Sequence, residues 1–474
     1  MHDFKLLIGG QRVAGDMTME VINPATERVI ALAPRASHAQ LDAAVAAAKA
    51  AFSTWSRTDI AVRRAALLAM ADILEQNLEE LARLTTLETG KPLADSRAEI
   101  GGAAYFTRYF AALDLAPQPM DPGDGRLVEI QRRPLGVIGA IVAWNYPLIM
   151  VGFKLPPALL AGNTVVLKPA PTAPLTTLRF AELFGAKLPP GVLNVIVDAN
   201  DLGEAMTSHP DIRKITFTGS TGTGKKIMAS AAPTLKRLTL ELGGNDAAIV
   251  MGDVDPQDVA PKLFDAAFVA SGQVCLALKR LYVHESIYEE MCELLVELAN
   301  GASVGDGLEQ GVTIGPLQNR MQFDRVKGLL EVAERDGRVI AGGVAGVAEA
   351  GEGFFVRPTI VRDITDGSPL VDEEQFGPIL PVISFSDPED ALARANASPY
   401  GLGGSIWSSD LRVARDFASR LDAGTVWINA HLGNAPNVPF GGSKQSGIGV
   451  EFGEAGLAEF TQAHAIYSPA EPTA

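Results

Sequence analysis

The chain has 474 residues, of which 47% are hydrophobic and 20% are charged. This length is too great for one hydrophobic core and predicts two or three domains, and the composition is that of a folded globular protein. The formal net charge of −16 argues against a nucleic-acid or anionic-membrane partner, since either would require clustered lysine and arginine.

Several other classes are disfavoured by short sequence features. The longest apolar run, near Val137–Ala143, contains Gly139 and is too short to span a bilayer. The N-terminal segment lacks the basic and apolar regions of a signal peptide. Two cysteines, Cys275 and Cys292, cannot form a disulfide framework, and six histidines without HExxH or CxxC spacing give no zinc site. A cytoplasmic protein without a resident metal is expected.

The first part of the chain is predicted to be helical. Apolar residues at helical spacing predict helices over Leu41–Phe52 and from about Ile60 to Leu87, the second ending at Gly90. A Pro/Gly-rich break over Ala116–Gly125 precedes a predicted strand over Leu127–Arg133, which is expected to form an arm or a sheet edge.

From Val137 onward, short β-branched strands alternate with helices, which predicts parallel sheets with helices on both faces. The first series of strands is predicted over Val137–Val142, Thr164–Leu167, Val192–Val197 and Ile215–Thr218. After Leu242 the alternation resumes and indicates a second α/β domain. Its first elements are predicted at Ala247–Met251, Val259–Ala270, Arg280–Val283 and Ile287–Leu298.

A glycine-rich turn follows the strand that ends at Thr218, reading Phe-Thr-Gly-Ser-Thr-Gly-Thr-Gly-Lys over 217–225. Small residues between a strand and a helix expose backbone N–H groups to an anion. The turn is not a P-loop, because Lys226 stands where the Mg²⁺-binding hydroxyl is required, and it lacks GxGxxG spacing. A tight turn without a ligand and a nucleotide-phosphate turn of non-standard type both remain open.

Glu241 is an isolated carboxylate in the apolar stretch Leu238–Leu242, directly before two glycines. Glutamate is rarely buried unless it is paired. The residue is therefore either an edge-strand carboxylate facing water or a general base with a raised pKa.

The two cysteines have different surroundings. Cys292 lies among Met291, Leu295 and Leu298 at helical spacing and is predicted to be part of the core. Cys275 instead follows a predicted helix end beside glycine and glutamine, where it is either an inert buried thiol or a nucleophile.

Two polar residues follow predicted buried strands. Asn145 is either a turn residue or an amide that stabilises a developing oxyanion. Lys168 is either a solvated charge or a cation for a ribose or a phosphate. The carboxyl ends of strands in open α/β sheets are where ligands bind.

Seven motifs follow one another along the chain. They are WNYP at 144–147, LKPA at 167–170, FTGSTGTG at 217–224, LELGG at 240–244, GQVC at 272–275, EEQFGP at 373–378, and PFGG at 439–442 followed by KQSG at 444–447. In this order they resemble the aldehyde dehydrogenase superfamily, and the resemblance covers essentially the whole chain.

The resemblance implies a role for each matching residue. Cys275 corresponds to the nucleophile and Glu241 to the general base. Asn145, with the backbone N–H of Cys275, corresponds to the oxyanion hole. Glu451 corresponds to a second acid that is sometimes assigned to proton relay. The chemistry implied is oxidation of an aldehyde to an acid through a thiohemiacetal and a thioester, hydrolysed by water that Glu241 activates.

The same resemblance implies NAD as the cofactor, with NADP possible. Lys168 is expected at the adenosine ribose, Ser220 and its glycine neighbours at the pyrophosphate, Glu374 at the nicotinamide ribose and Phe376 near the nicotinamide ring. The full expected set is Ile141, Val142, Ala143, Trp144, Lys168, Gly219, Ser220, Gly224, Leu242, Glu374 and Phe376. The chain has Pro171 where many family members have a ribose-binding glutamate, which leaves strict NAD preference open.

The family analogy also predicts the substrate channel and the assembly. An uncharged aliphatic or aromatic aldehyde is expected, because the expected channel lining is without Lys or Arg. The lining residues are Tyr146, Met150, Phe153, Val274, Leu276 and Leu432. Leu127–Arg133 and Phe460–Tyr467 are expected to form an arm that extends a neighbour's sheet in a homodimer or a homotetramer.

The domain organisation implied is a Rossmann-like cofactor domain over 1–115 and 135–243, a catalytic α/β domain over 244–445, and an oligomerisation arm with the C-terminal strand over 116–134 and 446–474. Two other functions remain open. A CoA-acylating or semialdehyde-oxidising relative is one, although acylating members typically lack a glutamate at position 241. A non-catalytic binding protein on the same fold is the other.

Overall fold

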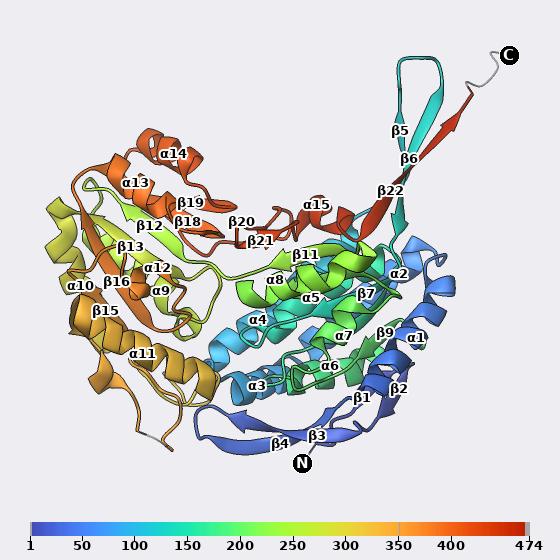
Figure 1. Cartoon of the computed structure of the whole chain (residues 1–474), viewed down its shortest axis with the longest axis horizontal. Helices are drawn as coiled ribbons and strands as arrows, with labels where there is room; N and C mark the ends of the chain where they lie inside the picture. The colour runs from blue at the N-terminus through green and yellow to red at the C-terminus, as the bar shows by residue number, and fades with distance from the viewer. Residues whose placement is uncertain (1, 350, 470–474) are drawn as a thin grey trace.

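The computed structural model describes residues 2–349 and 351–469. Two large sheets and a projecting arm make up the molecule (Figure 1). The predicted α/β fold with two α/β units and a small β arm is confirmed by this arrangement and by the structural comparisons given below. Among the described residues, no helix combines the length and apolar character needed to cross a membrane.

The first sheet has eight strands and is parallel at its centre. In spatial order they are β2 (Gln11–Val13), β1 (Leu6–Ile8), β9 (Leu193–Val195), β8 (Thr164–Lys168), β7 (Val137–Ile141), β10 (Ile212–Thr218), β11 (Arg237–Glu241) and β21 (Gly447–Ile448). β9, β8, β7, β10 and β11 are parallel to one another, β1 is antiparallel to both β9 and β2, and β21 is antiparallel to β11. The chain order reverses between β7 and β10, and such a switch point opens a crevice at the carboxyl ends of the strands.

Helices enclose this sheet. They are α1 (His38–Trp55), α2 (Ile60–Gln76), α3 (Leu78–Thr89), α4 (Leu93–Ala112), α5 (Pro147–Leu160), α6 (Leu175–Gly185), α7 (Gly203–Ser208) and α8 (Thr221–Ala231). The single helix predicted from Ile60 to Leu87 is two helices. Asn77 leaves helical geometry at φ −111°, and its side-chain amide donates to the Ile73 carbonyl at 2.8 Å, which caps α2. Gly90 ends α3 in the left-handed conformation at φ 83°, as predicted.

The second sheet has seven strands. Their order is β14 (Arg338–Ala341), β15 (Thr359–Arg362), β16 (Ile379–Phe385), β13 (Leu278–His284), β12 (Asp246–Val250), β18 (Gly403–Trp407) and β19 (Thr425–Ile428). All neighbours are parallel except β14 with β15. The helices of this unit are α9 (Pro256–Phe268), α10 (Tyr288–Gly301), α11 (Arg320–Asp336), α12 (Pro369–Asp372), α13 (Pro388–Asn396) and α14 (Leu411–Arg420).

The arm is a three-stranded antiparallel sheet of β5 (Gln118–Met120), β6 (Leu127–Pro134) and β22 (Thr461–Ser468). β6 and β22 pair along their whole length, from Thr461 opposite Pro134 to Ser468 opposite Leu127. Figure 1 shows this sheet extending away from the body beyond α15 (Gly453–Ala458). A separate hairpin is formed by β3 (Met17–Asn23) and β4 (Arg28–Arg35).

The domain boundaries stay a prediction. β21 lies in the range 446–474 predicted for the arm, yet it pairs with β11 in the first sheet. Residues 470–474, also included in that predicted range, lie outside the described residues.

Candidate active site

Three segments from the two α/β units meet between the sheets. They follow β7 at residues 144–145, follow β11 at residues 242–245, and precede β13 at residues 273–275. The Asn145 side-chain amide donates to the Gln273 carbonyl at 2.9 Å. A Cβ atom at Gly244 would lie 2.7 Å from the Cys275 carbonyl oxygen, so only glycine allows this approach. The structure therefore brings Asn145, Glu241 and Cys275, which lie far apart in sequence, into one region.

The turn before Cys275 is strained. Ala270, Ser271 and Gly272 all have left-handed backbone conformations, with φ of 48°, 58° and 71°. A Cβ atom at Gly272 would lie 2.3 Å from the Gly377 carbonyl oxygen. The Ser271 hydroxyl donates to the Gly315 carbonyl at 2.7 Å, which helps to hold this costly geometry. Strain of this kind concentrates at functional sites.

The two thiols differ as the sequence predicts. Cys292 is 1% exposed inside the core around α10, whereas Cys275 is partly exposed. Burial among its neighbours raises the pKa of Cys275 to about 12; Lys279 acts in the opposite direction, and the carboxylates of Glu241, Asp246 and Glu374 add to the increase. The resting thiol is therefore protonated and needs a base before it can attack.

Glu241 is a buried carboxylate that can act as this base. It ends β11 between β10 and β21, is 4% exposed, and neither carboxylate oxygen has a hydrogen-bond partner. Burial raises its pKa well above the usual range, Glu451 raises it further, and Lys154 lowers it. Since β11 is an interior strand, the alternative of a water-facing edge carboxylate is wrong. An unpartnered buried carboxylate of raised pKa is suited to general-base chemistry.

Glu451 forms a buried ion pair with Lys154 of α5. Their side chains are 5% and 0% exposed. The predicted second acid is thus coupled electrostatically to Glu241. Lys154 was missed from the sequence, where a lysine within an apolar helix carries no motif.

A second buried ion pair supports Asn145. Lys91 pairs with Glu99, donates to the Asn145 carbonyl at 2.6 Å and lies 3.6 Å from the Tyr146 ring centroid. Glu99 in turn accepts from the backbone N–H of Leu148 at 2.8 Å, at the start of α5. These contacts fix the turn that carries Asn145, whose side-chain amide has a second N–H beyond the one bound to Gln273.

The glycine-rich turn after β10 leads into α8 as predicted. Ser220 is the N-cap residue of α8 and accepts from the Thr223 N–H at 3.3 Å. A Cβ atom at Gly224 would lie 2.6 Å from the end of the Leu242 side chain, which would have to shift, whereas a Cβ atom at Gly222 would meet no atom within 4 Å. Gly219 donates to the Glu241 carbonyl at 3.0 Å. An open helix N-terminus beside the end of β11 can receive an anion.

The other expected cofactor residues of the first unit lie along the ends of β7 and β8. Ile141, Val142, Ala143 and Trp144 continue from β7, and Val142 donates to the Lys168 carbonyl at 3.1 Å. The Lys168 ammonium group lies 2.6 Å from a carboxylate oxygen of Asp198, a buried partner that the sequence did not reveal. Lysine has three donors, so this ion pair leaves two for a ligand.

The expected cofactor residues of the second unit lie beside the glycine pair. Glu374 accepts from the Gly244 N–H at 3.0 Å, and a Cβ atom at Gly243 would lie 2.3 Å from its other oxygen. Phe376 has a left-handed φ of 50° and contacts Trp144 edge to face, with ring centroids 5.4 Å apart. Trp144 of the first unit and Phe376 of the second unit thus contact each other.

The six residues expected at the substrate channel share apolar surroundings. Met150 and Leu276 belong to the hydrophobic core of the first unit. The other four residues are partly buried and pack against that core, as Cys275 does; they are Tyr146, Phe153, Val274 and Leu432. The Phe153 ring lies 4.6 Å from those of Phe106 and Phe452, measured between centroids.

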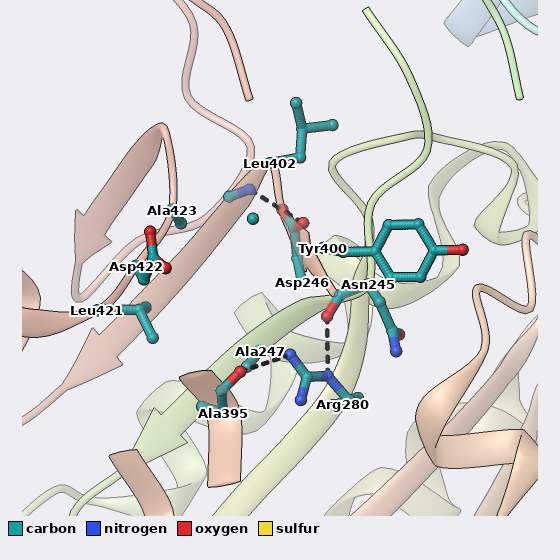
Figure 2. A pocket seen from close by; sticks show the side chains of 12 residues that line it. Asn245, Asp246, Ala247, Arg280, Ala395, Tyr400, Leu402, Leu421, Asp422 and Ala423 are labelled. Atoms are coloured by element: carbon teal, nitrogen blue, oxygen red, sulfur yellow. Dashed lines mark hydrogen bonds between the residues drawn. The ribbon is translucent and has the colours of Figure 1, made fainter. Parts of the chain in front are cut away.

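A polar pocket lies in the second unit, next to the glycine pair (Figure 2). One oxygen of Asp246 accepts from the Gly403 N–H at 3.0 Å, and the other has no hydrogen-bond partner. Arg280 donates to the carbonyls of Asn245 at 2.8 Å and Ala395 at 3.1 Å. Burial raises the pKa of Asp246 to about 7, and Lys279 opposes this increase. No group of three or more His, Cys, Asp or Glu side chains that could hold a metal occurs in the described ranges.

Comparison with known proteins identifies the family of the chain. The model of the aldehyde dehydrogenase family matches residues 12–466. Phenylacetaldehyde dehydrogenase of Pseudomonas fluorescens is 42% identical over 98% of this chain and 95% of its own length, and betaine aldehyde dehydrogenase of Vibrio vulnificus is 38% identical over 97% and 96%. A solved structure of aldehyde dehydrogenase from Bacillus cereus in complex with NAD+ has a TM-score of 0.96 at 37% identity, covering 99% of this chain and 97% of that one. The chain therefore belongs to the aldehyde dehydrogenase family.

Proposed function

We propose that this protein oxidises an uncharged aldehyde to the carboxylic acid with NAD(P)+, through a thioester on Cys275 that is hydrolysed by water. The main support for this proposal is the buried Glu241 carboxylate, which has no hydrogen-bond partner. It lies in the same region as the partly exposed thiol of Cys275 and the amide of Asn145.

The residues fit a dinucleotide cofactor. The open N-terminus of α8 at Gly222 would hold the pyrophosphate, Lys168 the adenosine ribose, and Glu374 with Phe376 the nicotinamide riboside. The cofactor supplies the hydride acceptor when it is bound. Relatives in the family have been solved with NAD+, which supports the assignment.

The first chemical step belongs to Cys275 and Asn145. The thiol gives its proton to Glu241, and its sulfur forms a bond to the aldehyde carbon while the carbonyl electron pair moves to oxygen. The free amide N–H of Asn145 and the backbone N–H of Cys275 stabilise that oxyanion. When the C=O bond re-forms, hydride leaves the same carbon and a thioester remains on Cys275.

Glu241 acts again in the second step. After it has released its proton to solvent, it takes a proton from water, and the resulting hydroxide attacks the thioester carbon. The C–S bond breaks, the acid leaves and the thiolate is protonated. The glutamate at this position favours water over CoA as the acceptor.

The proposed substrate is aliphatic or aromatic and carries no carboxylate. Its support is the apolar packing around Cys275. The relative named phenylacetaldehyde dehydrogenase acts, by its name, on an aromatic aldehyde, and the one named betaine aldehyde dehydrogenase on a cationic one.

The proposed cofactor is NAD, with NADP tolerated. Pro171 removes both a hydrogen-bonding group for the ribose and a charge that would repel a 2′-phosphate. We further propose a cytoplasmic enzyme that assembles through its arm as a homodimer or a homotetramer, in which exposed Met120, Leu127 and Tyr467 become covered.

A panel of aldehydes with NAD or NADP, followed at the absorbance of the reduced cofactor, tests the proposal. Benzaldehyde, phenylacetaldehyde or hexanal should give a higher kcat/KM than succinic semialdehyde, without CoA. Cys275→Ser should abolish the signal and keep cofactor binding, whereas Cys292→Ser should leave the kinetics unchanged. A reaction that requires CoA would identify an acylating enzyme, and absence of any reaction would identify a binding protein.

A further inference from the structure

Four consecutive backbone carbonyls at the proposed nucleophile are each bound by a buried side chain. The Lys279 ammonium group donates to the carbonyls of Val274 at 2.7 Å, Ala277 at 3.2 Å and Cys275 at 3.4 Å. The remaining carbonyl, that of Leu276, lies 2.9 Å from Nε2 of His431. Two side chains thus bind the carbonyls of the turn over 274–277, and only one of the two carries a charge.

The protonation of His431 follows from its partners. A carbonyl can only accept, so Nε2 carries the hydrogen that binds Leu276, and Nδ1 must accept from the Ser405 hydroxyl 2.9 Å away. That hydroxyl in turn accepts from the Trp407 indole at 2.8 Å. Burial lowers the pKa of His431 to about 4, so this residue is neutral and supplies no charge to the turn.

Lys279 is the charged member. Its side chain starts from β13, is 2% exposed, and its three hydrogen-bond partners are the three carbonyls named above, which match the three N–H donors of an ammonium group. An ammonium group bound in this way fixes the backbone on which the Cys275 thiol is carried. Its positive charge also acts on that thiol: burial raises the pKa of Cys275, and the charge of Lys279 lowers it.

Carboxylates balance this charge from two directions. Burial lowers the pKa of Lys279, whereas Glu374 beside Gly243 and Asp246 at the start of β12 raise it and so favour the charged ammonium group. In the pocket of Figure 2, one oxygen of Asp246 accepts from the Gly403 N–H. The other oxygen has no hydrogen-bond partner and lies 3.9 Å from Nε2 of the neutral His431.

We propose that Lys279 is a positioning residue for the nucleophile: it orders the turn over 274–277 and supplies the positive charge that favours the Cys275 thiolate, and Asp246 moderates that charge. The inference rests on the proposed function, because it presupposes that Cys275 reacts as a thiolate. Neutral hydrogen bonds could order the turn equally well. A charge is needed only if the thiol, which is only partly exposed, must ionise.

The directions of the electrostatic effects agree with this role. Burial raises the pKa of Cys275 and Lys279 opposes the increase, as expected for a cation near a thiol. The groups that face the thiol are Lys279 from β13, Glu241 from β11, Asp246 from β12 and Glu374 from its loop, together with Tyr146 at the start of α5. Lys279 is the cation among them.

The test measures the ionisation of the thiol directly. The full chain carrying Cys292→Ser is alkylated with iodoacetamide between pH 6 and 10, without cofactor or aldehyde, and the labelled peptide is identified by mass spectrometry. Lys279→Met, which keeps the length of the side chain without its charge, and Asp246→Asn, which keeps an acceptor for Gly403, are compared with the parent. Thermal unfolding and cofactor binding report whether each variant is folded.

Lys279→Met should shift the alkylation profile to higher pH and slow the reaction at pH 7 at least about tenfold, whereas Lys279→Arg, which keeps the positive charge, should slow it much less. A lysine that acted only through the exact fit of its three hydrogen bonds would be replaced equally badly by methionine and by arginine. Asp246→Asn should accelerate alkylation above pH 7, where Asp246 is ionised, and have little effect at pH 6, where it is largely protonated.

Opposite shifts in the two variants support the inference. An unshifted profile in folded Lys279→Met, or an unchanged or slower reaction in Asp246→Asn, overturns it. If Lys279→Met does not fold, Lys279→Gln, which keeps a neutral N–H donor without the charge, takes its place with the same expected slowing. Labelling at a residue other than Cys275, or oxidation that survives Cys275→Ser, would instead refute the proposed function.

Discussion

The buried pair of Lys154 and Glu451 should set the pH at which Glu241 works as a base. Because Glu241 must be ionised to accept a proton, activity is lost as the pH falls through its pKa. Lys154→Met removes the charge that lowers the pKa of Glu241 and leaves Glu451 without its partner, so the acidic limb of the kcat profile should move to higher pH. Glu451→Gln removes the charge that raises this pKa, so the limb should move to lower pH.

The burial of Lys154 and Glu451 determines the size of the pH shift and of the loss of stability. A charge change at close range moves a titration by about one pH unit or more, so the two profiles should be separated by about two. Each single variant also leaves one buried charge unpaired, since the two side chains are 0% and 5% exposed, which should cost about 3–5 kcal/mol of unfolding free energy. The double variant carries neither charge and should recover part of that loss.

Steady-state kcat from pH 5 to 10, at saturating cofactor and aldehyde, measures the first effect, and urea unfolding followed by tryptophan fluorescence measures the second. Arg97→Met breaks a pair with Glu79 whose side chains are 45% and 60% exposed, and it should leave the unfolding free energy almost unchanged, because solvent screens exposed pairs. Movement of the acidic limb in the same direction in both buried-pair variants would refute the assignment of that limb to Glu241.

Three further changes test separate parts of the site. Glu241→Gln should slow both the first turnover of reduced cofactor in stopped-flow absorbance and the steady-state turnover, by about 10²–10⁴-fold, because the same carboxylate accepts the thiol proton and activates water; a first turnover at the parent rate would exclude Glu241 as the base for the thiol, and an unaffected steady state would exclude it as the base for hydrolysis. Pro171→Glu should raise KM for NADP about fivefold relative to KM for NAD, as expected for two like charges at about 4 Å in water, and equal changes in both constants would place residue 171 away from the ribose. His431→Phe leaves the Leu276 carbonyl unpaired and should cost about 1–3 kcal/mol in urea unfolding, whereas a free energy like that of the parent would show that this hydrogen bond is dispensable.

The family and the α/β fold could be predicted because their signals are local. Strand and helix alternation, the glycine-rich turn before α8 and the left-handed stop at Gly90 each lie within a few consecutive residues, and the structure confirms all three. The predicted core position of Cys292 is confirmed for the same reason, since helical spacing alone determines which face of α10 is buried.

The buried charges could not be predicted because their partners are remote in sequence. Lys154 and Glu451 are 297 residues apart, and Lys91 meets the carbonyl of Asn145 54 residues away. A lysine in a sequence is most often a solvated surface charge, and only the tertiary structure shows that Lys154 is enclosed. The burial of Glu241 was open for the same reason, because it depends on β21 covering β11 from the other end of the chain.

The glycine pair after Glu241 determines how closely the parts of the site can approach. A side chain at Gly244 would collide with the backbone carbonyl of Cys275 at 2.7 Å, whereas one at Gly243 would collide with the carboxylate of Glu374 at 2.3 Å. Backbone cannot yield as the end of a flexible side chain can, so Gly244 constrains the nucleophile more tightly than Gly243 constrains the expected cofactor contact. Gly243 and Gly244 directly follow Glu241 at the carboxyl end of β11. The position of the proposed base therefore also determines how closely Cys275 and Glu374 can approach it.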